Sequence, residues 1–468
     1  MEADKQRLQL ERKVGLIGAI SFIAGTMIGS GIFMSPQYAL SSIGSPGASL
    51  VIWVCCGLIA VLGGLCYAEL GTVIPESGAE YIYMLRTAGK VVAFMFLTSF
   101  NSVLRPASTT GIALSFAEYV VALFYDGCPP PQLVVKCVAA GGIMGVAIIN
   151  CMSIRLATDI QVVSTVVKVL ALVVIVLGSV VVFVQGNNQK LDYSFEGTNV
   201  GVSSIVIAFY QCLWSYDGWN TLNFLTEELK HPEVNLPRAV VIAISLVTGL
   251  YLLVNVSYLS VMTPKELMSS SAVAVTWGNK VLGSWGWIMS VAAALSAFGS
   301  LNGTFFSGGR VCFVAAREGH MPDILAMAHV HRLTPSPALI FTTVISLLVL
   351  IPGDFQSIVN LFSFTAWFFY AITLSGLIYL KIKKPELPRP YSVPIILPIV
   401  VVIAAIFLVL APIVDSPQIE YLYVTLFIIS GVIIYIPFIH YKLCPGLLTK
   451  LTLFLQLFLE VAPAEKNL

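Results

Sequence analysis

Long apolar runs constrain this chain more than any other feature. A helix needs roughly 20 mostly apolar residues to cross a bilayer. Hydrophobic residues make up 57% of the chain and charged residues 10%, whereas a soluble domain carries about a quarter charged residues. The sequence therefore predicts an all-α membrane protein with twelve transmembrane helices. The runs cover residues 14–39, 46–70, 90–123, 132–150, 158–185, 201–229, 237–262, 284–316, 337–352, 354–380, 392–413 and 419–441.

The basic residues are unevenly distributed among the loops between these runs. Cytosolic loops carry an excess of Lys and Arg, and most basic residues collect on the side of the N-terminus. We therefore predict that both termini are cytosolic, with residues 1–13 as the N-terminal segment and 442–468 as the tail. No cleavable signal peptide is expected. The basic residues of the outer loops are Lys136, Lys190, Lys265 and Lys280.

Three segments outside the runs are not expected to cross the membrane. Residues 71–89 are semi-polar, which favours a re-entrant or interfacial stretch. Residues 317–336 are polar and are expected to form a cytosolic connector. Residues 446–461 carry apolar side chains at helical spacing, which predicts a helix along the inner membrane surface.

Two runs are interrupted by glycine and small polar residues. One interruption is Gly25-Thr-Met-Ile-Gly-Ser-Gly-Ile-Phe33, and the other, five runs later, is Leu213-Trp-Ser-Tyr-Asp-Gly-Trp-Asn220. This weak symmetry divides the chain into helices 1–5 over 14–185 and helices 6–10 over 201–380, followed by helices 11 and 12 over 392–441. Interrupted segments at corresponding positions of two halves indicate a transporter binding site.

The first interruption contains Gly29, Ser30 and Gly31, and its glycines disfavour a helix. Each glycine costs about 1 kcal/mol relative to alanine in a helix. Backbone groups freed in a membrane must find partners unless they line a cavity, and a half-helix N-terminus offers donors and partial positive charge to a carboxylate. The alternative is a small-residue packing face, since Gly25 and Gly29 are four residues apart. The partner interruption favours a binding site.

The second interruption contains Trp214 and Asp217. An acid deep in an apolar span is costly and is a functional-site hypothesis by default. Asp217 would pair with a cationic substrate side chain, with a base of the protein, or be protonated; we favour the substrate. Trp214 is either a lid over the substrate or an ordinary packing residue.

Two basic residues also lie inside apolar runs. Lys168 is interpreted either as a fixed cation that replaces a sodium ion and holds the first broken helix, or as a residue that snorkels to an interface. Arg105 precedes Pro106, which predicts a kink, and faces the substrate path or the carbonyls of a neighbour. The acids near span ends favour interfacial ion pairs: Glu69, Glu118, Glu227 and Glu228.

Nine cysteines are present, and Cys128 differs from those in apolar runs because it lies in an outer loop. An unpaired cysteine on the oxidising side indicates an intermolecular disulfide, and a free thiol is the alternative. The glycosylation patterns at Asn255 and Asn302 fall within spans, which is unusual for an unaccompanied surface protein. No cysteine spacing resembles a zinc site, so neither metal nor cofactor is expected.

The polar residues do not form the constellations of other membrane protein classes. No nucleophile–base arrangement of an enzyme stands out. No ring of charged or carbonyl-rich filter residues indicates a channel. The polar residues instead belong to a path through the membrane.

Several motifs together resemble the amino acid–polyamine–organocation superfamily. The resemblance extends from residue 13 to about 464 and is closest to the light chains of heteromeric amino-acid transporters. The motifs are GTMIGSGIF at 25–33, AELGTVIPESGAEY at 68–81, SYDGWNTLNFLTEEL at 215–229, NLPRA at 235–239 and REGHMP at 317–322.

Within that group, Trp214 and the run 216–220 resemble the b(0,+)-type light chain, which exchanges cystine and dibasic amino acids for neutral ones. The resemblance implies a leucine-transporter fold, with ten core helices in two inverted repeats of five and breaks in helices 1 and 6. It also implies sodium-independent exchange by alternating access in the plasma membrane. The rival interpretations are an exchanger restricted to neutral amino acids and a non-transporting receptor or channel.

The resemblance also assigns roles to residues. It implies that Cys128 is joined by a disulfide to a single-span glycoprotein heavy chain, and that Lys168 matches the family's lysine in span 5. Asp217 would meet a cationic side chain. Two departures, Arg105 in place of lysine and a missing second proline after Glu460, suggest a paralogue with an altered substrate range or surface delivery. The residues implied to bind the substrate's α-carboxylate and α-amino groups are Met27, Ile28, Gly29, Ser30 and Gly31.

Overall fold

The protein is an α-helical bundle in the computed structural model, which describes residues 14–463 except 77, 126–127, 187–194, 225, 227–228, 308–310, 312–314, 316–317, 332–334 and 444. Each of the twelve apolar runs contains helix. The first half comprises α1 Leu16–Met27, α2 Gly31–Ile43, α3 Pro46–Val73, α4 Glu80–Thr87, α5 Lys90–Ser99, η1 Phe100–Leu104, α6 Arg105–Val121, α7 Gln132–Met152 and α8 Ile154–Val184.

The second half begins with a helix that is followed by a short 3₁₀ turn. Its elements up to residue 307 are α9 Val202–Ser215, η2 Thr221–Phe224, α10 Pro232–Val261, α11 Pro264–Ser269, α12 Val273–Val281, η4 Gly283–Trp285 and α13 Trp287–Ser307. The later ones are η5 Asp323–Ala326, β1 Met327–His329, α15 Ser336–Leu350, α16 Phe355–Lys383, α17 Ile396–Asp415, α18 Ile419–Tyr435, η6 Ile436–His440, α19 Pro445–Leu459 and β2 Val461–Pro463.

Eight helical segments of the described chain are long and apolar enough to cross a membrane, and the bent pair α1–α2 is a ninth. The axes of α1 and α2 differ by 51° across the break. The long segments lie in α3, α7, α8, α10, α13, α16, α17 and α18. The expected all-α membrane protein is therefore confirmed, while the count of twelve spans stays a prediction because α9 and α15 are shorter.

A π-helical turn, η1, lies directly before α6 and Pro106; a kink there stays a prediction. Proline has no backbone N–H and crowds the preceding turn of a helix. A π-helical turn adds one residue to the ladder and accommodates such a site without ending the helix. Arg105 and Pro106 are the first two residues of α6.

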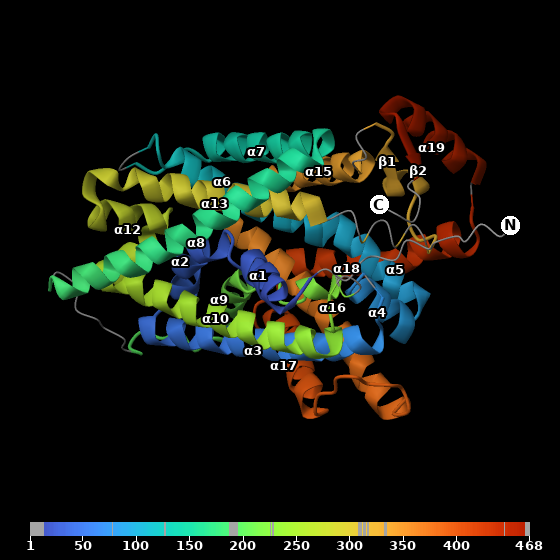
Figure 1. Cartoon of the computed structure of the whole chain (residues 1–468), viewed down its shortest axis with the longest axis horizontal. Coiled ribbons are helices and arrows are strands. Elements are labelled where there is room, and N and C mark those ends of the chain that lie inside the picture. The colour runs from blue at the N-terminus through green and yellow to red at the C-terminus, as the bar shows by residue number, and fades with distance from the viewer. Residues whose placement is uncertain are drawn as a thin grey trace.

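The two broken helices lie next to each other inside the bundle (Figure 1). α2 packs along α9, and α1 packs along α10. α10 in turn packs against α3, while α13 lies against α6 and α8. This arrangement brings both interruptions of the sequence into one central region.

The C-terminal tail folds back onto the connector before α15. β2 pairs antiparallel with β1, so that Val461 lies opposite His329 and Pro463 opposite Met327. Figure 1 shows α19, β1 and β2 at the end of the bundle that also carries α4 and α5, opposite α12. The sequence did not predict this sheet. The helix of the tail exposes Leu451, Phe454 and other apolar side chains; its contact with a membrane stays a prediction.

Candidate functional site

The break between α1 and α2 leaves backbone donors free. The amide of Ile28 donates to Ala24 O at 2.9 Å, and that of Phe33 donates to Ser30 O at 3.2 Å. The amides of Gly29 and Ser30 donate to no group in the part of the chain that the structure describes. Ser30 caps α2 without a side-chain hydrogen bond. The N-terminus of α2 therefore presents unsatisfied N–H groups, as helix starts do.

The residues of this break are buried in the centre of the bundle. Met27 is 3% exposed, Ile28 5% and Ser30 3%. Free N–H groups in such a place are costly unless a bound molecule or water accepts from them. The five expected substrate-binding residues, 27–31, thus form one continuous buried segment.

A close backbone contact with Ser215 explains why glycine is needed at position 31, and a serine hydroxyl crowds position 29. A Cβ on Gly31 would lie 2.5 Å from Ser215 Oγ, and one on Gly29 would lie 2.7 Å from Ser300 Oγ. A Cβ on Gly25 would meet nothing closer than 4.0 Å. The packing alternative therefore applies to Gly29 but not to Gly25. The hydroxyls of Ser215 and Ser300 are buried and have no partner among the described residues.

The second break follows Ser215, where α9 ends. The amide of Asp217 donates to Trp214 O at 3.2 Å, and that of Thr221 donates to Gly218 O at 3.1 Å. Gly218 has φ of +114°, a value that side chains disfavour and glycine permits. A Cβ there would also lie 2.9 Å from Thr26 of α1, which places Asp217 beside the first break.

The carboxylate of Asp217 forms no ion pair with a described residue, and the backbone amide of Gly218 is the group that stabilises its charge. Glu69 gives the contrast, because it lies 2.9 Å from Lys381 Nζ and 3.4 Å from Arg389 Nε. Glu69 is therefore ion-paired as predicted, and its side chain is fully buried; its position at a membrane interface stays a prediction. The structure shows no basic protein partner for Asp217 among these residues. The negative charge of Asp217 would then be neutralised by a cationic substrate or by a proton.

Trp214 is packed against aromatic neighbours. Its ring lies 5.1 Å from that of Phe362 and 6.2 Å from that of Phe355, both edge to face. A Cβ on Gly111 would lie 3.2 Å from its indole. These contacts fit the packing alternative, and a role as a lid stays a prediction.

Lys168 lies inside the bundle on α8. Its ammonium donates to Gly25 O of α1 at 3.3 Å, and the residue is 1% exposed. A snorkelling lysine would bring its charge to the surface, so this burial disfavours that alternative. The side chain connects α8 to the turn of α1 that precedes the break.

Of the remaining predicted residues, Arg105 is buried, Cys128 is exposed, and two acids lie outside the described residues. Arg105 is 4% exposed at the start of α6. Cys128 is exposed and unpaired in the loop before α7. Cys137, on α7, is exposed as well, and no sequence pattern singles it out. Glu227 and Glu228 lie outside the described residues.

Two residues near the breaks were missed by sequence reasoning. The hydroxyl of Tyr251, on α10, donates toward Met27 O and Ser215 O, both at 2.7 Å. Glu80 of α4 is 4% exposed and accepts a hydrogen bond from Asn220, just after the second break. A tyrosine in an apolar run and a glutamate in a semi-polar loop are common, so only the folded contacts single them out.

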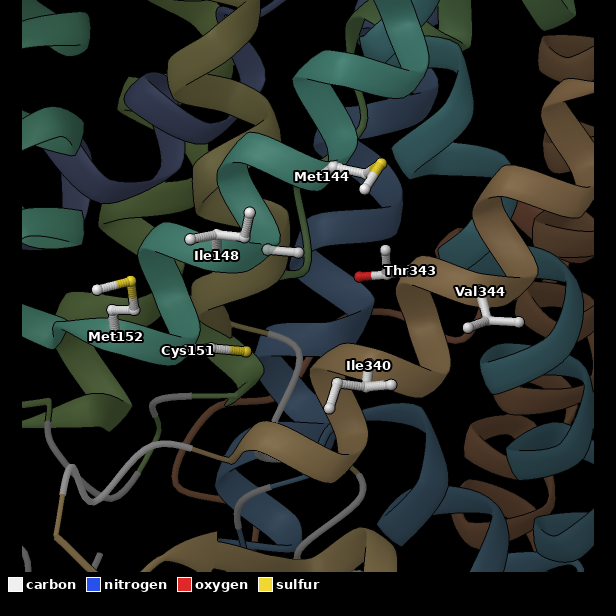
Figure 2. Close-up of a pocket in the computed structure, with 8 residues that line it drawn as sticks. Met144, Ile148, Cys151, Met152, Ile340, Thr343 and Val344 are labelled. Carbon is white, nitrogen blue, oxygen red and sulfur yellow. The ribbon is translucent and has the colours of Figure 1, made fainter. Parts of the chain in front are cut away.

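A groove of about 280 Å³ lies on the outer surface between α7 and α15 (Figure 2). Met144, Ile148 and Met152 form one wall, while Ile340, Thr343 and Val344 form the other. The hydroxyl of Thr343 donates to Leu339 O at 2.7 Å. The groove therefore lacks the charged and backbone groups that gather at the breaks and is not the predicted site.

Comparison with known proteins identifies the family of the chain. The family model described as amino acid permease matches residues 14–438. The human b(0,+)-type amino acid transporter 1 is 47% identical over 460 residues, covering 98% of this chain and 94% of the relative. The human cystine/glutamate transporter is 38% identical over 468 residues, covering 99% and 93%. The human large neutral amino acids transporter small subunit 2 is 41% identical over 413 residues, covering 87% and 77%.

The family and these relatives are transporters and not enzymes, which confirms the expectation drawn from the motifs. The match includes both helix breaks and the helices that enclose them. The chain belongs to the amino acid permease family.

Proposed function

We propose that this protein is a sodium-independent antiporter that exchanges extracellular cystine and cationic amino acids for intracellular neutral ones. The observation that carries the proposal is the carboxylate of Asp217, which forms no ion pair with a described residue and lies beside the free amides of the first break. An amino acid with a cationic side chain has a carboxylate for the amides and a cation for Asp217. The names of the relatives support transport of amino acids.

The two breaks have different tasks in this proposal. Residues Met27 to Gly31 bind the α-carboxylate and α-amino groups, which all amino acids share. A helix N-terminus suits a carboxylate because of its free N–H groups and its partial positive charge. Asp217 selects among side chains, and Trp214 covers the bound substrate. Lys168 supplies the positive charge that a sodium ion provides in sodium-coupled transport.

The same proposal includes the finer architecture. Twelve spans adopt the leucine-transporter fold, with helices 1–5 and 6–10 as inverted repeats, and one repeat rocks against the other around the breaks. Both termini are cytosolic in the plasma membrane. A single-span glycoprotein heavy chain is joined through Cys128. The word "subunit" in the name of one relative supports such an assembly.

Replacement of Asp217 by asparagine tests the proposal. Loss of one member of a buried charge pair costs about 2 kcal/mol or more, so we expect the KM for arginine to rise about 30-fold or more. The KM for leucine should stay within about twofold. Uptake of labelled arginine and leucine, normalised to surface protein, measures both.

The matched control is Asp415→Asn at the end of α17, an exposed acid that accepts from Ser203 at 2.7 Å. This control variant should change neither the KM for arginine nor the KM for leucine. Equal loss of arginine and leucine uptake in Asp217→Asn would make Asp217 structural. A competition panel of cystine, arginine, leucine and glutamate separates the alternatives: arginine that fails to compete would indicate an exchanger restricted to neutral amino acids.

A further inference from the structure

Helix α10 passes behind both breaks and carries one side chain that contacts each of them. The hydroxyl of Tyr251 lies 2.7 Å from Met27 O and 2.7 Å from Ser215 O. Met27 is the last residue of α1, and Ser215 is the last residue of α9. One atom therefore joins the C-terminal ends of the two half-helices on which the proposed site depends.

The C-terminal ends of α1 and α9 need a hydrogen-bond donor, and the hydroxyl of Tyr251 provides one. The last carbonyls of a helix have no intrahelical partner, and in a buried place each needs a donor. A tyrosine hydroxyl has a single proton, which Tyr251 shares between the two carbonyls. If α1 and α9 moved apart, the hydroxyl would keep its hydrogen bond to one carbonyl, and the other carbonyl would lose its donor. The shared proton thus favours the arrangement in which the two ends stay together.

The ring of Tyr251 is held in place by other aromatic side chains. Its centroid lies 5.2 Å from that of Tyr216 and 5.7 Å from that of Trp53, both in edge-to-face contact. The hydroxyl of Tyr216 donates to Trp53 O at 3.1 Å. Tyr251 is fully buried. The hydroxyl therefore has a fixed position relative to α3 and α10, against which the two half-helices are aligned.

We propose that Tyr251 is a positioning residue that aligns the two breaks, so that the free amides of Gly29 and Ser30 and the carboxylate of Asp217 face the same amino acid. This inference rests on the proposed function and deepens it. It separates alignment from selection: Asp217 distinguishes side chains, whereas Tyr251 acts on every substrate alike. The hydroxyl touches no substrate in this assignment and acts through the backbone of both half-helices.

Replacement of Tyr251 by phenylalanine removes the hydroxyl and keeps the ring. We expect the KM for leucine and the KM for arginine to rise by the same factor, about 3- to 10-fold, which corresponds to the net contribution of one hydrogen bond. The matched control is Tyr258→Phe on the same helix. Tyr258 is fully buried too, and its hydroxyl has no hydrogen-bond partner among the described residues. That variant should leave both KM values unchanged.

Hydrogen exchange of the purified protein gives a second readout that needs no transport. Amides of residues 24–33 and 210–220 should exchange faster in Tyr251→Phe than in Tyr258→Phe. Indistinguishable exchange in the two variants would overturn the proposal, as would a lower protein yield with unchanged KM. An effect on arginine alone would also overturn it. If the unaltered chain transports leucine but not arginine, the proposed substrate range is wrong. The KM for leucine in the two variants still tests whether Tyr251 aligns the breaks.

Discussion

Lys168 illustrates how much a single buried charge depends on its surroundings. Its ammonium is 1% exposed and meets Gly25 O at 3.3 Å. Burial of a charge without compensation is costly. The hydrogen bond between α8 and α1 offsets part of this cost. The acceptor belongs to the last turn of α1, next to the break. We therefore place the role of Lys168 in holding α1 in its bent form.

At the same scale, Lys168→Met should weaken binding of every amino acid. A hydrogen bond to a charged group contributes about 1.5–3 kcal/mol, which corresponds to a rise in KM of about 10- to 100-fold for leucine and arginine. Uptake in choline and in sodium buffers measures the change. Lys136 provides the control, since it also donates to a carbonyl, Ile351 O at 2.7 Å, but lies on the surface. An equal effect of Lys136→Met would contradict the assignment.

At the scale of elements, the short helix α4 holds the second break from one end of the bundle. Glu80 accepts from Asn220, and Asn223 donates to the hydroxyl of Tyr83 at 2.9 Å. The hydroxyl of Tyr81 lies 2.8 Å from His320 Nδ1, in the connector after α13. Burial lowers the pKa of His320, which favours the neutral imidazole. α4 thus connects the break to the connector that carries β1.

Substitutions of Glu80 distinguish a mechanical role of α4 from an electrostatic one. Glu80→Gln keeps a side-chain oxygen that accepts from Asn220, so exchange of leucine should stay near the unaltered rate. Glu80→Ala removes the acceptor and should lower the maximal rate by about 3- to 10-fold for both leucine and arginine. Rates of exchange in proteoliposomes give the measurement. A selective loss of arginine in Glu80→Gln would instead assign the carboxylate to the substrate.

The elements also show where sequence reasoning succeeds and where it stops. Glycine and serine at 29–31, and glycine at 218, disfavour helix locally, so both breaks could be predicted. The bond from Tyr251 to Met27 and Ser215 joins segments far apart in the chain, and no local pattern encodes it. The pairing of β1 with β2 depends likewise on how the tail folds back.

At the scale of the whole molecule, the exposed cysteines are the candidate points of attachment for the proposed heavy chain. Cys128 lies in the loop between α6 and α7, and Cys137 lies within α7 itself. A disulfide requires Cα atoms about 4.4–6.8 Å apart, and a loop outside the apolar spans can meet a partner at that distance. Cys137 follows Lys136, whose ammonium is bonded to Ile351 O, and is fixed on a helix that faces lipid in the proposed topology. Cys128 is therefore the better-placed thiol.

Cys128→Ser should remove a high-mass band from non-reducing gels of the tagged chain expressed in epithelial cells, and Cys137→Ser should leave that band in place. The band should also disappear from the unaltered chain under reduction, because a disulfide persists only in an oxidising environment. Loss of the band in Cys137→Ser alone would reassign the linkage to α7. Its survival in the double variant would exclude a disulfide through Cys128 or Cys137. A heavy chain that remained bound in Cys128→Ser, detected by co-purification, would show that contacts beyond the disulfide contribute to the assembly.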